Sequence, residues 1–247
     1  MRHWQGKRYW VVGASEGLGR SVAILLSKLG VEVILSARSE DRLTALAAEL
    51  PGKSQVVPVD ISDMASVKAA AKAVGEIDGV VFLAGVYWPQ SVQNWNPDEV
   101  EAMCDVNFTG AARVVGNVIG QMVARDSGHV VLTGSLSAFR GLPGAIGYAA
   151  SKGGVQALAE SMECDLRGSG VQVQIINPGY IKTRLTDKNT HAMPFIMEPD
   201  DAAREMVEFM GTDRFKKSFP RFFSLFFRAS QFFPDWLYYK VFGSGGK

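Results

Sequence analysis

Short apolar runs alternate along the chain with longer segments in which apolar residues recur at helical spacing. Short continuous apolar runs are typical of buried strands, and recurrence every three to four residues is typical of amphipathic helices. The pattern predicts strands at residues 8–13, 31–35, 55–59, 79–83, 129–132 and 171–176. It predicts helices at residues 18–29, 41–50, 64–74, 97–124 and 147–167, and another that starts at Asp200. Asn96 is the expected N-cap of the helix that begins at Pro97.

This alternation of single strands with single helices predicts βαβ units. The expected fold class is α/β: a single-domain, Rossmann-type, doubly wound parallel sheet with helices on both faces. At 247 residues the chain has the size of one large domain, and no repeat or linker divides it. We expect a main domain over residues 1–210, followed by a C-terminal segment at 211–247.

The C-terminal segment differs in composition from the rest. It holds 12 of the chain's 25 aromatic residues, with seven basic and two acidic side chains. Its spacing predicts an amphipathic helix with one face formed by Phe219, Phe222, Phe223, Phe226 and Phe227, and a polar face formed by Arg221, Ser224, Arg228 and Gln231. Three interpretations stay open: the segment packs on its own domain or pocket, on a partner subunit, or on a lipid interface.

Composition and charge exclude several classes of protein. A formal net charge of +1 is too small for a protein that binds nucleic-acid phosphates. Cys104 and Cys164 lack metal-ligand spacing, so no metal site is expected, and they read as reduced cytoplasmic thiols. No run approaches the ~18 apolar residues of a spanning helix, and the N-terminus lacks the apolar stretch of a secretion signal. We therefore expect a cytoplasmic protein that is soluble or rests on a membrane surface.

A glycine-bearing loop joins the first predicted strand to the first predicted helix. In Gly13-Ala-Ser-Glu-Gly17-Leu-Gly19 the glycines permit a sharp turn, a close approach of pyrophosphate and close helix packing. The loop predicts a dinucleotide site that includes Ser15, Glu16 and Leu18, although three glycines also occur in ordinary turns.

The end of the second strand bears on the choice of cofactor. The stretch 36–39 has no carboxylate to bind the ribose of NAD, whereas Arg38 can pair with a 2′-phosphate, helped by the hydroxyl of Ser15, Ser36 or Ser39. This favours NADP(H) over NAD as the cofactor; the alternative is that Arg38 is a solvated residue that opens the next helix. Asp60 and Ile61, after the third strand, are expected at the adenine edge, and Asp60 is equally suited to cap the next helix.

Tyr148 and Lys152 lie four residues apart on one predicted helix and so share a face. A free tyrosine titrates near ~10, and a nearby cation favours the phenolate. The pair therefore predicts an acid/base group whose pKa is lowered by Lys152, although a Tyr-x-x-x-Lys spacing is common by chance.

The ordered motifs together resemble the short-chain dehydrogenase/reductase family over roughly residues 8–210. The motifs are the glycine loop, Asn107, Ser135, Tyr148 with Lys152, and Pro178-Gly179 followed by Thr183. The resemblance implies that Tyr148 is the general acid in carbonyl reduction and the base in alcohol oxidation. It implies that Ser135 donates a hydrogen bond to the reacting oxygen and that Lys152 also grips the nicotinamide ribose.

The same resemblance assigns further cofactor contacts. It places the main chain of Ile181 and the hydroxyl of Thr183 on the nicotinamide carboxamide. It implies that Asn107 holds a water molecule that links Lys152 to solvent. The alternative is that Asn107 is only a buried residue at a kink in the helix. The expected catalytic residues are Asn107, Ser135, Tyr148 and Lys152. The expected cofactor-binding residues are Gly13, Ser15, Glu16, Gly17, Leu18, Gly19, Arg38, Asp60, Ile61, Ala84, Gly85, Tyr148, Lys152, Pro178, Gly179, Ile181 and Thr183.

The chain departs from the family pattern in two places. Phe82-Leu83-Ala84-Gly85 stands where the family commonly has Asn-Asn-Ala-Gly, and Val12 stands where threonine is frequent. Ala84 and Gly85 still permit a close backbone approach to the adenosine half of a cofactor, so binding is expected to survive.

A substrate lid is expected at about residues 186–198. Met193, Phe195, Ile196 and Met197 are predicted to close an apolar pocket opposite Tyr87 and Trp88, and His191 is a weaker candidate for a ligand contact.

These observations together predict an NADP(H)-dependent reductase or alcohol dehydrogenase for an apolar carbonyl or alcohol compound, of which a lipid-like compound is one example. The alternative is a cofactor-binding regulator or scaffold with little turnover. By resemblance, the helices predicted at 97–124 and 147–167 form homodimers or homotetramers.

Overall fold

A seven-stranded parallel sheet forms the centre of the computed structural model, which describes residues 2–189 and 192–243. The strand order is β3-β2-β1-β4-β5-β6-β7, and every neighbouring pair is parallel. The strands are β1 Arg8–Val12, β2 Glu32–Ser36, β3 Ser54–Val56, β4 Gly79–Phe82, β5 Gly128–Thr133, β6 Val171–Pro178 and β7 Lys216–Phe219. The order reverses between β1 and β4, so the chain is doubly wound as predicted.

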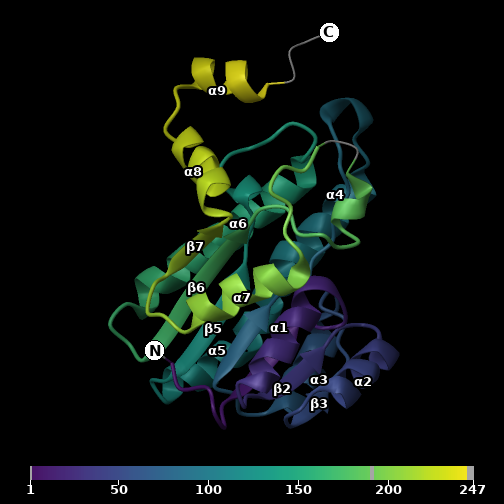
Figure 1. Ribbon diagram of the computed structural model, residues 1–247, viewed down its shortest axis with the longest axis vertical. Helices are drawn as coiled ribbons and strands as arrows, with labels where there is room; N and C mark the ends of the chain where they lie inside the picture. The colour runs from purple at the N-terminus through teal and green to yellow at the C-terminus, as the bar shows by residue number, and fades with distance from the viewer. Residues whose placement is uncertain (1, 190–191, 244–247) are drawn as a thin grey trace.

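Helices cover both faces of this sheet (Figure 1). Helices α1 Gly17–Lys28, α2 Glu40–Glu49 and α7 Pro199–Met210 bury residues such as Leu26, Leu43 and Met206 in one core. Helices α3 Met64–Val74, α5 Gly110–Ala124 and α6 Ile146–Leu166 bury residues such as Val67 and Val114 in the other. The two cores explain why the central strands are apolar on both sides.

The helix predicted at 97–124 is continuous but not uniform. It begins with α4 Pro97–Met103, capped by Asn96, whose side chain accepts from the backbone N–H groups of Asp98 and Glu99. A π-helical segment, Cys104–Thr109, then precedes α5. The extra residue of a π turn rotates a side chain relative to a regular helix, and here it brings Asn107 to full burial.

The C-terminal segment contains one strand and two helices that the sequence analysis described incorrectly. The helix expected from Phe219 starts later: Phe219 ends strand β7, which was missed because Lys216 and Lys217 conceal its apolar character. In helix α8, Arg221–Ser230, the predicted apolar face is divided: Phe223 and Phe227 are partly buried, whereas Phe222 is 82% exposed. Ser224, from the predicted polar face, is buried together with Ser230. Helix α9, Asp235–Phe242, follows and was not predicted.

The described residues contain neither a helix suited to span a membrane nor a cluster of side chains suited to hold a metal ion. Across residues 2–189 and 192–243, no helix is both long and apolar enough to cross a bilayer. The same part of the chain contains no group of three or more His, Cys, Asp or Glu side chains arranged to hold a metal ion.

Candidate active site

A cleft of about 730 Å³ opens at the carboxyl ends of the strands, along the reversal between β1 and β4. This is where open parallel sheets bind their ligands. All the cofactor-binding residues expected from the sequence line this cleft, although they come from five separate segments at the strand ends and from helix α6. Ser39, one of the hydroxyls expected beside Arg38, also lines it. Arg42, Ser62 and Arg184 line it too and were not predicted.

The glycine loop forms one wall of the cleft in a conformation that glycine permits. Gly13 has a φ of 94°, and a Cβ added there would lie 2.5 Å from the backbone nitrogen of Ala84. Gly17 has a φ of 52°, and a Cβ there would lie 2.9 Å from Cγ2 of Thr183. The glycine loop therefore lies close to the loop after β4 and to the loop after β6. Because glycines carry no side chains, the backbone amides at the start of α1 are left facing the cleft. This arrangement fits a dinucleotide pyrophosphate.

Two arginine side chains line the end of the cleft beside β2. Arg38 lines it together with Arg42, which lies one helical turn further along the chain. Arg42 Nη1 is 3.0 Å from Glu16 Oε2, and Arg184 pairs with the same carboxylate. The spacing of Arg42 from Arg38 could have identified it from the sequence, whereas no sequence pattern points to Arg184.

The structure answers two questions that the sequence left open at this end of the cleft, the roles of Ser36 and Asp60. Ser36 is not available to a cofactor, because it is fully buried, accepts from Trp10 Nε1 and donates to the carbonyl of Val57. Asp60 does not cap α3: Asp63 does so, while Asp60 accepts from the backbone and hydroxyl of Ser62. These hydrogen bonds lower the pKa of Asp60.

Tyr148 stands where this cleft meets a second cavity, and it lines both. Its phenol is hydrogen-bonded to Ser135. Ser135 Oγ in turn accepts from the backbone N–H of Ser137 at 3.2 Å and from its hydroxyl at 2.9 Å. Since both of those contacts donate to Ser135, its own proton remains for Tyr148 or for a ligand.

Lys152 is buried beside Tyr148 but bonds elsewhere. Its Nζ donates to the carbonyl of Thr133 at 2.9 Å and lies 5.8 Å from the centroid of the Tyr148 ring. Burial lowers the pKa of Lys152 to about 8. The expected lowering of the Tyr148 pKa is wrong for this structure: burial raises it to about 12, the bond to Ser135 opposes the rise, and Tyr87 adds to it. Desolvation outweighs the attraction of a cation that is turned toward Thr133.

Asn107 ties three segments together behind the catalytic pair. Its Oδ1 accepts from the backbone N–H of Val86 at 2.7 Å, and its Nδ2 donates to the carbonyl of Val86 and to Ser151 Oγ, both at 3.0 Å. A Cβ added at Gly85 would lie 3.2 Å from Asn107 Oδ1 and 3.8 Å from Lys152 Nζ. Asn107 therefore fixes the loop after β4 against α6, and its expected water contact stays a prediction.

The second cavity, of about 530 Å³, is the candidate substrate pocket. Tyr87, Leu142, Pro143 and Leu185 give it apolar walls, and Phe223 and Phe227 from α8 close one side. Packing of the C-terminal segment on the pocket was one of the three interpretations left open by the sequence, and Phe223 and Phe227 agree with it.

The wall expected from the lid is different from the one observed. Met193, Phe195, Ile196 and Met197 do not line the cavity, and Phe195 is 64% exposed. Trp88 lies outside the cavity too, under the Lys188 ammonium at 4.2 Å. The lid approaches the pocket through Leu185, Thr186 and Asn189 instead. His191 lies outside the described residues.

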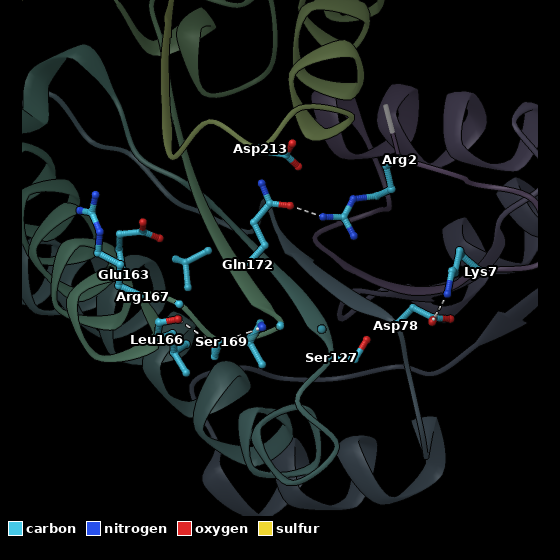
Figure 2. Close-up of a pocket in the computed structure, with 15 residues that line it drawn as sticks. Arg2, Lys7, Asp78, Ser127, Glu163, Leu166, Arg167, Ser169, Gln172 and Asp213 are labelled. Atoms are coloured by element: carbon cyan, nitrogen blue, oxygen red, sulfur yellow. Dashed lines mark hydrogen bonds and ion pairs between the residues drawn. The ribbon is translucent and has the colours of Figure 1, made fainter.

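A polar cavity of about 380 Å³ lies at the opposite, amino-terminal edge of the sheet (Figure 2). Lys7 Nζ and Asp78 Oδ1 pair across it at 2.9 Å, and Arg2 donates to Gln172. None of the site residues expected from the sequence lines this cavity, so the candidate active site remains the cleft at the carboxyl edge.

The fold and this site define an oxidoreductase class, and comparison with known proteins names the family. The chain belongs to the short-chain dehydrogenase family, whose model, described as short chain dehydrogenase, matches residues 7–194. An uncharacterized oxidoreductase of Myxococcus xanthus is 39% identical over 208 residues, which cover 81% of each chain. Members of this family are oxidoreductases that use NAD or NADP.

Solved structures share the fold. A short chain dehydrogenase/reductase family protein superposes with a TM-score of 0.81 at 24% identity, over 88% of this chain and 97% of the other. An alcohol dehydrogenase of Thermococcus sibiricus, complexed with 5-hydroxy-NADP, superposes with a TM-score of 0.78 at 24% identity, over 86% and 95%.

Proposed function

We propose that the protein is an NADP(H)-dependent oxidoreductase that interconverts a carbonyl and a secondary alcohol on an apolar substrate, with Tyr148 as the acid/base group. The position of Tyr148 carries the proposal, because it is in the wall common to the cofactor cleft and the apolar cavity. A substrate oxygen beside Tyr148 would then lie next to the reactive end of a bound dinucleotide.

The chain's own residues supply the proton and orient the reacting oxygen. A bound nicotinamide supplies or accepts hydride. As a carbonyl is reduced, negative charge develops on its oxygen, and the Tyr148 phenol donates its proton there while Ser135 donates a hydrogen bond. A pKa of about 12 keeps the phenol protonated at neutral pH, which suits the reductive direction. The Lys152 charge stabilises the phenolate left behind.

The preference for NADP(H) rests on Arg38 and Arg42 at the end of the cleft where an adenine ribose would lie. A guanidinium forms charge-assisted, two-pronged hydrogen bonds with a phosphate. Glu16 partly neutralises Arg42, so Arg38 is expected to contribute most of the selectivity.

The apolar walls of the cavity indicate the substrate class. Leu142, Leu185, Phe223 and Phe227 surround Tyr148 with hydrocarbon, and Asn189 is among the few amide groups there. Such a cavity favours ketones and secondary alcohols with bulky apolar groups over charged metabolites. Self-association through α4, α5 and α6 stays a prediction from the family resemblance.

NADPH oxidation followed at 340 nm with a panel of apolar ketones tests the function. Tyr148→Phe should lower kcat by about 100-fold or more, because it removes the proton donor, and should leave NADPH binding nearly unchanged. Tyr239→Phe, at an exposed tyrosine of α9, is the matched control and should retain full activity. Undiminished turnover by Tyr148→Phe would reject the assigned acid. Binding of NADPH without turnover of any ketone or alcohol would favour the regulator instead.

A further inference from the structure

Helices α8 and α9 carry the largest group of exposed aromatic side chains among the described residues. They lie at one end of the molecule, beyond the end of the sheet (Figure 1). Phe222 is 82% exposed, Phe232 87% and Trp236 70%. We call the group the C-terminal apolar face; it consists of Phe222, Leu225, Phe226, Phe232, Trp236, Tyr239 and Val241. So many exposed large apolar side chains within one short stretch of chain are typical of an interaction site in a soluble protein.

The inward sides of these helices are fixed to the domain, so their outward sides are held in place. Tyr238 is buried and donates through its hydroxyl to the carbonyl of Gly141 at 2.6 Å. The Arg140 guanidinium lies 3.9 Å from the Tyr238 ring centroid and donates to the carbonyl of Phe233 at 2.7 Å. A ring contact at 5.2 Å between Phe226 and Phe242 joins the two helices. The apolar face is thus part of the folded structure.

Helix α8 exposes apolar side chains and buries serines, which is the reverse of what a helix packed on a core does. Phe222, Leu225 and Phe226 follow one another at helical spacing on the exposed side, whereas Ser224 and Ser230 are buried. Moving a phenylalanine side chain from water to an apolar environment is favourable, so presenting this side of the helix to water alone is unfavourable. The orientation makes physical sense if another apolar medium covers the exposed side.

The charge around the apolar face indicates which medium that is. Arg221 and Arg228 are exposed one heptad apart on α8, and Lys240 is exposed on α9. Asp235, the acidic residue of this region, pairs with Arg140. A twofold contact between copies of the chain would oppose like charges, whereas an anionic surface attracts them.

The dimensions agree with a surface contact. Helix α8 has 10 residues and α9 has 8, so each is about 12–15 Å long, roughly half of a hydrocarbon core. Tryptophan and tyrosine favour the boundary between headgroups and hydrocarbon, where Trp236 and Tyr239 would lie.

We propose that the C-terminal apolar face docks on the surface of an anionic lipid bilayer, with the aromatic rings in the interface and Arg221, Arg228 and Lys240 near the headgroups. Phe223 and Phe227, on the inner side of α8, line the candidate substrate pocket. Docking therefore places that pocket next to the bilayer, where apolar compounds concentrate. The binding itself does not depend on the proposed catalytic activity.

Vesicle flotation of the full-length protein tests the proposal. Vesicles of phosphatidylcholine alone are compared with an equal mixture of phosphatidylcholine and phosphatidylglycerol, at low and high salt. We expect binding to the anionic vesicles that weakens with salt. Phe222→Ser combined with Trp236→Ser should lower the partition coefficient at least about tenfold, and Arg221→Gln with Arg228→Gln should lower it about fivefold per charge.

Matched controls separate docking from folding. Trp95→Ser removes an exposed tryptophan, 51% accessible, from another part of the surface and should leave vesicle binding unchanged. Thermal unfolding midpoints should be similar for all these variants, because the altered side chains are exposed. Point changes are preferable to truncation after Gly211, since truncation would remove strand β7 from the sheet.

Three results would overturn the proposal. The first is failure of the full-length protein to float with anionic vesicles. The second is binding that survives the Phe222→Ser, Trp236→Ser change or that is equal on neutral vesicles. The third is light scattering that shows a dimer dissociated by this change, without vesicle binding, which would assign the face to a second copy of the chain.

Discussion

Raising the pH should switch off carbonyl reduction through Lys152. Its ammonium is buried, and burial lowers its pKa to about 8, whereas the pKa of Tyr148 is raised to about 12. The charged lysine is therefore present below about pH 8 and is lost as the pH rises through that value. The charged fraction is about 10% at pH 9 and about 1% at pH 10. Because Tyr148 stays protonated over this range, kcat/KM for reduction should fall about tenfold per pH unit above pH 8.

The assay is the initial rate of NADPH oxidation with a ketone that the enzyme reduces, from about pH 6 to about pH 10. Lys152→Arg is the control, since a guanidinium keeps its charge throughout. Its kcat/KM should be lower than that of the natural protein, because the longer fork displaces the bond to Thr133, but should not fall at pH 8. A flat profile for the natural protein, or a fall at the same pH in Lys152→Arg, would refute the role of the Lys152 charge.

Other changes test separate parts of the structure. Arg38→Ala should lower the ratio of kcat/KM for NADPH to that for NADH by about tenfold or more, because it removes a charge-assisted contact; an unchanged ratio would remove Arg38 from the site. Phe227→Ala should enlarge the substrate pocket and shift kcat/KM about tenfold toward bulkier ketones, and equal losses for small and large ketones would contradict this. Burial lowers the pKa of His129 to about 3, below its unfolded value of about 6.5, so the unfolded state binds the proton more tightly. Stability should therefore be complete above about pH 6.5 and fall by about 2 kcal/mol between pH 7 and pH 5, as measured by urea unfolding, and His129→Gln should lose this part of the pH dependence.

The sheet and its helices follow from local pattern. Helix α3 begins and ends where its periodicity predicts, and the first six strands begin or end within a few residues of their predicted positions. Strand β7 was missed because two lysines interrupt its apolar pattern. It forms because its backbone pairs with β6, and backbone pairing does not depend on the side-chain pattern.

The expected cofactor-binding residues were identified because parallel strands end at one edge. Motifs that follow successive strands must therefore meet, even when they lie as far apart as Gly13 and Thr183. The substrate pocket was not predictable in the same way. Phe223 and Phe227 reach it because β7 directs the chain back over the end of the sheet, and the lid residues Phe195 and Ile196 turn outward.

The doubly wound fold, the glycine loop and the Tyr148–Lys152 pair could be derived from the amino-acid sequence, because each depends on residues close together in the chain. The direction of the Lys152 ammonium, the buried side of α8 and the residues that line the pocket became known from the three-dimensional structure alone. These depend on desolvation and on contacts between distant segments. A buried group responds to everything packed around it, and its neighbours along the chain specify only a small part of those surroundings.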